Sequence, residues 1–226
     1  MSISFNEEKI NSSIENEISD VFRKFDFKKI KPSEKLVEKR FVDAISDGIK
    51  ESMIRFDDLI IMGQDIAEYG GVFKITEGFV EKFGKDRVRN TPICESSIIE
   101  IAMGLSISKR KSIVELQFSD FITSGFNPVV NYLAKIHYRW GQNADVVLRM
   151  PCGAGVGAGP FHSQTNEAWF TKTPGLIVVY PAFPYDAKGL LISSIENPNP
   201  VLFFEHKALY RSCLLYTSDA ADEHSW

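Results

Sequence analysis

The chain is poor in cysteine, with three among 226 residues, Cys94, Cys152 and Cys213, and it has no C-x-x-C pair. No cluster of His and Cys has zinc spacing either, so the sequence gives no sign of a scaffold held by disulfides or zinc, and a reducing compartment is favoured. Long apolar runs are also lacking, and the acidic start has no apolar signal core. We therefore expect an intracellular, cytoplasmic protein that does not span a membrane.

The chain also has no excess of positive charge, because its formal net charge is -4 and no basic stripe with interleaved aromatic residues occurs. Nucleic acid is therefore not expected to be a main partner. Hydrophobic residues make up 44% of the chain, which is typical of a globular protein. The length allows one large domain with an appendage.

From residue 57 onward, short apolar runs alternate with helical patterns. The expected strands are 59–63, 87–93, 112–118, 145–151, 175–181 and 200–206, and the expected helices between them are 76–84, 96–107, 127–140, 165–172 and 184–197. Strands that alternate with helices indicate right-handed βαβ units. The predicted fold is α/β, a parallel sheet covered by helices on both faces.

Composition divides the chain into three parts. Residues 1–32 are polar and lysine-rich and predict a tail or linker. Residues 33–212 predict one domain that opens with a helix capped by Ser33, and that helix presents Leu36, Phe41, Ile45, Ile49 and Met53. Residues 213–226 read "CLLYTSDAADEHSW" and continue no periodicity. They resemble translated sequencing-adapter sequence, so we expect a non-native tail and a natural chain that goes on past Ser212.

A glycine-rich run, "RMPCGAGVGAGPFHSQTNEAWF", covers residues 149–170. Gly153, Gly155 and Ala158 fit the spacing of the dinucleotide-binding fingerprint. The context does not fit, because Gly159-Pro160 breaks the required helix and no acidic residue stands about 20 positions further on. A dinucleotide site is therefore not expected. A plain glycine turn stays open, although it gives no reason for His162 to follow at once.

Polar and aromatic candidates follow three of the expected strands. Glu95 comes after the run 87–93, Gln117 and Phe121 lie at the end of the next, and His162 follows the glycine-rich loop. Ligand sites in parallel sheets form at the carboxyl ends of the strands. We therefore expect these residues to lie on one edge of one sheet.

Four stretches in this order carry a resemblance that covers roughly residues 36–212. They are "IMGQDIAEYGGVFKITEGFVEKFGKDRVRNTPICE" (61–95), "VELQFSDF" (114–121), "FHSQTNEAWFTKTPGLIVVYPAFPYDAKGLL" (161–191) and "NPVLFFEHKALYR" (199–211). The chain resembles the beta subunit of the thiamin-diphosphate-dependent 2-oxo acid dehydrogenase E1 component, or the beta half of a fused alpha and beta chain. "QFSDF", "HSQTNEAWF" and "FFEHKALYR" look closer to branched-chain enzymes than to pyruvate enzymes.

The resemblance implies a transketolase-like pyrimidine-binding domain and a catalytic role for Glu95. Glu95 matches the carboxylate that hydrogen-bonds the pyrimidine ring of thiamin diphosphate and promotes removal of the thiazolium C2 proton. From the residues alone, the favoured interpretation of Glu95 is an acidic residue that stabilises the first turn of a helix.

Further roles follow from the same resemblance. Ile93 and Phe121 match apolar residues that line the pyrimidine pocket, Gln117 lies at the same wall, and His162 matches a catalytic histidine near the substrate. Main-chain carbonyls near five residues match a potassium site of branched-chain members, at Val146, Val147, Ser194, Asn197 and Asn199. Loop capping explains the asparagines equally well.

The magnesium-binding half of such a site is missing from the sequence, because no Gly-Asp-Gly motif occurs. The resemblance therefore implies that an E1 alpha subunit supplies the ligands of Mg²⁺, alongside a second beta subunit. It also implies a 2-oxo acid substrate and the lipoyl domain of an E2 acyltransferase as acyl acceptor. Two alternatives stay open: another thiamin-diphosphate enzyme, of the transketolase or deoxyxylulose phosphate synthase type, and a non-catalytic assembly subunit of the same fold.

Overall fold

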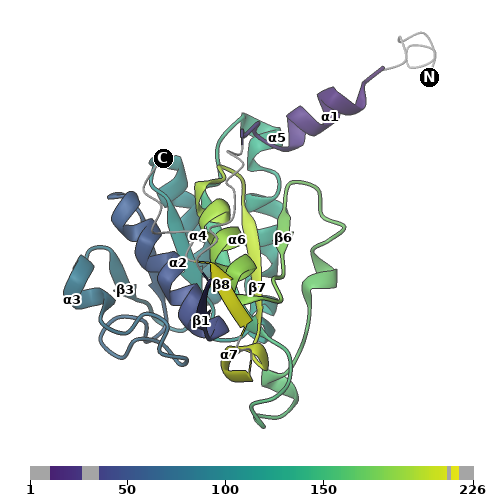
Figure 1. Cartoon of the computed structure of the whole chain (residues 1–226). Helices are drawn as coiled ribbons and strands as arrows, with labels where there is room; N and C mark the ends of the chain where they lie inside the picture. Colours follow the sequence, from purple (N-terminus) through teal and green to yellow (C-terminus); the bar gives the residue numbers. More distant parts are fainter. Residues whose placement is uncertain (1–10, 27–35, 213–214, 219–226) are drawn as a thin grey trace, which may run out of the picture.

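A computed structural model describes residues 11–26, 36–212 and 215–218. Its centre is a six-stranded sheet in which every neighbouring pair is parallel, in the order β3-β2-β4-β5-β7-β6 (Figure 1). The strands are β2 (Ile60–Gly63), β3 (Val88–Asn90), β4 (Ser112–Glu115), β5 (Val146–Cys152), β6 (Ile177–Val179) and β7 (Val201–His206). Each matches one expected run, which confirms the predicted parallel α/β sheet.

Several strands end earlier than the apolar runs suggested. The strand expected at 87–93 stops at Asn90, because Pro92 cannot donate to a strand ladder and biases Thr91 toward a turn or extended connection. β6 covers only Ile177–Val179 of the expected 175–181. β4 is followed closely by η1 (Ser119–Thr123), a 3₁₀ helix that carries two of the candidate site residues.

Helices cover both faces of the sheet, as the alternating side chains of its strands require. On one face, Ile61, Ile113 and Val147 pack in a core with α2 (Phe41–Arg55) and α6 (Pro184–Glu196). On the other face, Val114 and Leu148 pack with α4 (Glu95–Ile107), η2 (Pro128–Leu133) and α5 (Ile136–Trp140). The shorter helical elements are α3 (Phe79–Phe83), η3 (Pro160–His162), η4 (Glu167–Trp169) and α7 (Leu209–Ser212).

The helix expected at 127–140 is interrupted. η2 is a π-helical turn in which Ala134 N donates to Val129 O at 3.0 Å, and α5 begins only at Ile136. The helix expected at 165–172 is reduced to η4, and the helix expected at 76–84 to α3. In η4, the short i→i+3 bonds from Trp169 N and Phe170 N bring Phe170 into the core.

The beginning of the domain differs from the expectation. Leu36 lies in a strand, β1 (Leu36–Lys39), which pairs antiparallel with β8 (Leu215–Ser218). The helix begins only after Arg40, whose side chain bonds Asp43, and the proposed cap at Ser33 lies outside the described residues. Phe41, Ile45, Ile49 and Met53 are buried on α2 as the helical spacing predicted. β8 falls in the segment 213–226, and the prediction of a non-native origin for that segment stays a prediction.

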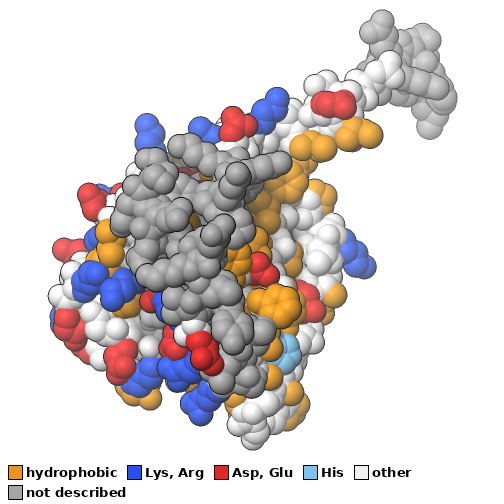
Figure 2. All heavy atoms as spheres, in the orientation of Figure 1, with side chains coloured by type: hydrophobic (Ala, Val, Ile, Leu, Met, Phe, Trp, Pro, Cys, Tyr) orange, Lys and Arg blue, Asp and Glu red, His pale blue; other side chains and the backbone are white. Residues whose placement is uncertain are grey.

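The expected tail at 1–32 contains a helix, α1 (Ile14–Val21), which extends from the domain near α5 (Figure 1). The missed signal is Ser13, whose hydroxyl accepts a hydrogen bond from Asn16 N at 3.2 Å and so caps the helix. Ile14 and Ile18 are 71% and 57% exposed, and hydrophobic side chains are visible along α1 in Figure 2. The segment therefore has structure that its polar composition did not predict.

Cys94 and Cys152 are thiols outside any disulfide, the first exposed and the second buried. Within the described ranges, every helix is too short or too polar to cross a bilayer.

Gly175 provides a test of how η2 packs against the start of β6. Its φ is +90°, and a Cβ there would collide with the main-chain carbonyl of Ala134. Because the main chain at Gly175 or at Ala134 would have to shift to relieve this collision, we expect Gly175→Ala to lower the free energy of unfolding by about 1–3 kcal/mol. Urea denaturation measures the change.

Gly104 is the matched control, since it lies inside α4 and a Cβ there would meet nothing within 4 Å. Gly104→Ala should stabilise the protein by about 0.5–1 kcal/mol, because alanine loses less backbone entropy in a helix. Equal denaturation midpoints for the two variants would contradict this view of the packing.

Candidate functional site

The candidate site lies where the loops after β2, β3, β4 and β5 meet at the carboxyl edge of the sheet. Chain order explains the convergence, because parallel strands all end at the same edge. η1 is central, since it holds Phe121 at its middle and leads to Ser124, and both contact residues from other loops.

Glu95 is the first residue of α4 and is 8% exposed. Gln64 Nε2, from the turn after β2, donates to Glu95 Oε1 at 3.3 Å. Ser124 Oγ lies 3.0 Å from Glu95 Oε2 and 2.9 Å from Phe121 O, and its single proton can serve one of these acceptors at a time. Both carboxyl oxygens are therefore oriented by side chains from two different loops, which a purely helix-capping role does not require.

The close approach of η1 to α4 depends on Gly125. Its Cα lies against the first turn of α4, and a Cβ there would come 3.6 Å from the backbone of Glu95 and 2.5 Å from Ile99 Cδ1. The glycine after Ser124 thus lets the serine hydroxyl reach the carboxylate.

Aromatic rings surround His162. The imidazole meets Phe118 and Phe121 edge to face, with ring centroids 4.9 and 5.5 Å away. His162 Nδ1 is buried and has no hydrogen-bond partner among the described residues. The side chain of His162 as a whole is only half-buried, so its ring can still meet a ligand and exchange a proton with that ligand.

The glycine-rich loop delivers His162 without forming a helix at the glycines. Gly153, Gly155, Gly157 and Gly159 all have positive φ, and the first helical turn after them is the three-residue η3. This geometry agrees with the expectation that the loop is not a dinucleotide fingerprint. At Gly153 the chain passes so close to His206 that a Cβ would lie 2.6 Å from His206 Nε2.

The other predicted cofactor-binding residues have different surroundings. Ile93 is 84% exposed, two residues before Glu95, so it offers an apolar side chain at the rim of the site. Gln117 is half-buried after β4, and its Nε2 lies 3.5 Å from Asp65 Oδ2. The structure thus brings Glu95, Phe121 and His162 around η1 and places Gln117 toward the turn after β2.

The five residues of the proposed potassium site lie on β5, on α6 and in the loop after α6. Asn197 Oδ1 accepts from Asn199 N and Nδ2 at 3.0 and 2.9 Å, and Ser194 Oγ donates to Leu190 O. Asn199 Oδ1 accepts from Arg23 N, so its amide also fixes the segment after α1. Hydrogen bonds of this kind are the ones expected if the asparagines cap the loop. Because these side-chain oxygens already have partners, a potassium ion would have to be bound by main-chain carbonyls.

Three buried charged residues, Glu115, Arg149 and Glu205, lie on the adjacent strands β4, β5 and β7. Arg149 donates to Glu115 Oε2 at 2.6 Å and to Glu205 Oε1 and Oε2 at 2.7 and 2.8 Å, and Tyr210 Oη donates to Glu205 Oε2 at 2.5 Å. Burial raises the pKa of Glu115, although Arg149 opposes it. Burial lowers the pKa of Arg149, but Glu205 and Glu115 more than offset this and raise it above its ordinary value.

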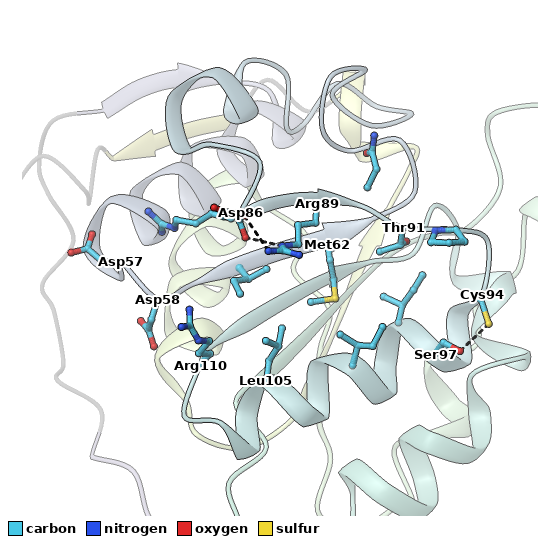
Figure 3. Close-up of a pocket in the computed structure, with 16 residues that line it drawn as sticks. Asp57, Asp58, Met62, Asp86, Arg89, Thr91, Cys94, Ser97, Leu105 and Arg110 are labelled. Atoms are coloured by element: carbon cyan, nitrogen blue, oxygen red, sulfur yellow. Dashed lines mark hydrogen bonds and ion pairs between the residues drawn. The ribbon is translucent and has the colours of Figure 1, made fainter.

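A pocket of about 820 Å³ lies beside the site, between β2, β3 and α4 (Figure 3). Apolar side chains such as Met62 and Leu105 line it, and Asp57, Asp58 and Arg110 lie toward one end. At the other end Cys94 Sγ lies 3.1 Å from Ser97 Oγ, but Glu95 does not line the pocket. The pocket is therefore distinct from the cluster around the carboxylate.

Sequence reasoning missed four residues of this edge: Gln64, Ser124, Asp120 and Lys207. Gln64 directly follows a strand, so the carboxyl-edge rule could have found it. Asp120 lies between the candidate residues Gln117 and Phe121, in "QFSDF", and Lys207 directly follows β7. Ser124 has no comparable signal, because it reaches Glu95 only through the fold.

Comparison with known proteins gives matches over most of the domain. The family model described as transketolase, pyrimidine binding domain matches residues 38–212. The 2-oxoisovalerate dehydrogenase subunit beta of Bacillus subtilis is 43% identical over 173 residues, which cover 76% of this chain and 53% of that protein. The pyruvate dehydrogenase E1 component subunit beta of Staphylococcus epidermidis is 41% identical over 179 residues, 78% of this chain and 55% of its own length. The chain thus spans about half the length of these curated relatives.

A solved structure shows the same fold. An inactive beta4 tetramer of a split-gene transketolase matches with a TM-score of 0.59 and 18% identity, over 73% of this chain and 50% of that one. At this identity the similarity supports the architecture alone.

Proposed function

Because the chain belongs to the transketolase pyrimidine-binding domain family, we propose that it forms the pyrimidine-binding half of a thiamin-diphosphate site in the beta part of a 2-oxo acid dehydrogenase E1 component. The whole enzyme would decarboxylate a 2-oxo acid and transfer the acyl group to the lipoyl group of an E2 acyltransferase. The relatives carry both 2-oxoisovalerate and pyruvate names at nearly equal identity, and the motifs "QFSDF" and "FFEHKALYR" favour a branched-chain substrate.

The oriented carboxyl group of Glu95 carries this proposal. A buried carboxyl group that Gln64 and Ser124 hold, at the edge of the sheet where Phe121 also packs against His162, is suited to hold or move a proton at a ring nitrogen. The exposed Ile93 and the half-buried Phe121 provide apolar surface of the kind that covers an aromatic ring. The donor set and the apolar wall therefore fit the pyrimidine of thiamin diphosphate.

Each residue would have a defined task. Glu95 would exchange a proton at the pyrimidine, while Gln64 and Ser124 keep the carboxyl group in one orientation. Phe121 and Ile93 would exclude water, and the half-buried imidazole of His162 would accept or donate a proton near the substrate. Thiamin diphosphate, when bound, supplies the carbanion chemistry that protein side chains lack.

The diphosphate end requires ligands from elsewhere. Magnesium at a diphosphate prefers carboxylate and carbonyl oxygens, and the described residues contain no group of three His, Cys, Asp or Glu side chains that could hold a metal. The sequence also lacks Gly-Asp-Gly. We therefore infer that an alpha subunit or domain supplies the Mg²⁺ ligands, with a second beta subunit completing the assembly. Potassium and a cytoplasmic location belong to the same proposal.

Calorimetry with thiamin diphosphate and Mg²⁺ tests the half-site. We expect no measurable binding to this chain alone and saturable binding to a mixture with the alpha chain of a bacterial branched-chain E1, because only the mixture contains both halves. Glu95→Gln in the mixture should weaken binding, whereas the exposed Glu100→Gln on the same helix should not.

Two results would contradict the proposal. Tight binding to the chain alone would place the diphosphate ligands within this chain and favour an enzyme of the transketolase or deoxyxylulose phosphate synthase type. A stable complex with the alpha chain that binds no thiamin diphosphate would favour a non-catalytic assembly subunit.

A further inference from the structure

Asp120 connects η1 to the loop that carries His162. Its Oδ1 accepts hydrogen bonds from Ser163 N and Gln164 N, each at 3.1 Å, and these are the two residues directly after His162. Asp120 is 5% exposed, so the accepting carboxyl group is largely shielded from water. A carboxylate that accepts two main-chain N–H groups away from water makes charge-assisted bonds, which are stronger than neutral ones.

Neighbouring contacts hold the same loop on the same side. Asn166 Nδ2 donates to Ser119 O at 2.8 Å, and Gly153 N donates to Gln164 O at 2.8 Å. η1 therefore contacts the loop at 163, 164 and 166, while Phe121 of η1 packs against the imidazole itself. The position of His162 relative to the aromatic wall depends on this attachment.

A second buried charged side chain, Lys207, lies on the same side of the domain and is attracted by Asp120. Lys207 is 4% exposed, its ammonium lies 5.0 Å from the centre of the Phe118 ring, and its main-chain N donates to Cys152 O at 3.0 Å. Burial lowers the pKa of Lys207, and attraction to Asp120 opposes that change. Asp120 Oδ2 and Lys207 Nζ have no hydrogen-bond partner among the described residues, so their interaction is purely electrostatic in this structure.

We propose that Asp120 and Lys207 act as a buried positioning pair: Asp120 fixes the loop that carries His162 to η1, and the buried ammonium group of Lys207 stabilises Asp120 in that position. The catalytic consequence rests on the proposed function, because it assumes that His162 takes part in turnover. The attachment of the loop does not rest on it and can be measured without any substrate.

Amide hydrogen exchange in the full chain tests the attachment directly. Asp120→Ala removes the acceptor, so the amides of Ser163 and Gln164 should exchange at least about tenfold faster, and the ring-proton chemical shifts of His162 should change. Asp120→Asn keeps an oxygen acceptor and should give an intermediate rate. Asp57→Asn, at an exposed carboxylate before β2, is the control and should leave these signals unchanged. Unchanged exchange at both amides in Asp120→Ala would overturn the proposal.

Turnover with an alpha chain tests the pair. Asp120→Ala should lower kcat about 10–100-fold with a smaller change in KM, because displacement of a catalytic group by about 1 Å can cost a hundredfold in rate. Lys207→Met should lower kcat as well, and Lys207→Arg should restore part of the loss. The double variant Asp120→Asn/Lys207→Met should lose less kcat than the product of the losses in Asp120→Asn and Lys207→Met. The reason is that the double variant leaves no buried unpaired charge. Strict multiplicativity would show that the two residues act independently and would refute the pairing.

His162→Ala separates this proposal from the proposed function. If His162→Ala keeps full turnover while Asp120→Ala loses amide protection, the catalytic assignment of His162 fails and the attachment stands. If His162→Ala is inactive while Asp120→Ala keeps its amide protection and its kcat, the positioning role fails and the proposed function stands.

Discussion

Glu95→Gln is expected to lower kcat of the reconstituted enzyme by about 10²–10⁴-fold, the usual contribution of a positioned general acid or base. The amide preserves the shape of the side chain and one oxygen acceptor for Gln64 or Ser124, but it cannot exchange a proton with a ring nitrogen. Stability should change little, because both neighbouring donors can rotate toward the remaining oxygen. Steady-state kinetics with a branched-chain 2-oxo acid and a thermal melt measure the two quantities.

Glu100→Gln controls for the loss of one negative charge on α4, because Glu100 is exposed five residues further along the helix. Its kcat should equal that of the unaltered protein. Full turnover in Glu95→Gln would remove the catalytic role and restore the interpretation of Glu95 as a residue that favours a helix terminus. A large fall in melting temperature would instead assign Glu95 a structural role.

Arg149→Met should have the largest effect on stability, a loss of about 3–5 kcal/mol, because it leaves two buried carboxylates without their cation. Glu115 and Glu205 are 3% and 0% exposed, so water cannot replace the lost bonds. Urea denaturation followed by circular dichroism measures the loss. Arg40→Met, which removes a largely exposed pair with Asp43, should cost less than about 1 kcal/mol.

The loss in Arg149→Met should also depend on pH. Burial already raises the pKa of Glu115 in the intact network, and without the arginine no cation opposes this, so the folded-state pKa of Glu115 rises further above its unfolded value. The folded protein then holds more protons than the unfolded chain, so stability falls as pH rises, by about 1.4 kcal/mol per pH unit for each retained proton. We expect the variant to be most stable near pH 5 and to lose stability toward pH 8. A pH-independent loss would show that packing, and not charge, explains the effect.

The sheet could be predicted because parallel strands that are buried on both faces appear in the sequence as continuous apolar runs. Ile60–Gly63, Val146–Cys152 and Val201–His206 are buried almost throughout, and their spacing leaves room for helices between them. The carboxyl-edge rule then selected Glu95, Phe121 and His162, which the fold does bring around η1. Their chemical roles stay predictions, and Glu95→Gln and His162→Ala test two of them.

The charge network could not be predicted in the same way. The partners of Arg149, Glu115 and Glu205, are 34 and 56 residues away from it in the sequence. Only strand register makes Glu115 and Arg149 neighbours, on β4 and β5. Ser124 was missed for a related reason, since its contact with Glu95 depends on the path of η1.

The short edge strands have a consequence for how copies of the chain meet. β3 and β6, at the two edges of the six-stranded sheet, are three residues long each. Proline follows soon after both, at Pro92 and Pro181, and leaves few main-chain groups in line for pairing. A strand from another copy that paired with β3 or β6 would form too few main-chain hydrogen bonds to fix its register. Association through helices and loops is therefore favoured over edge-to-edge aggregation.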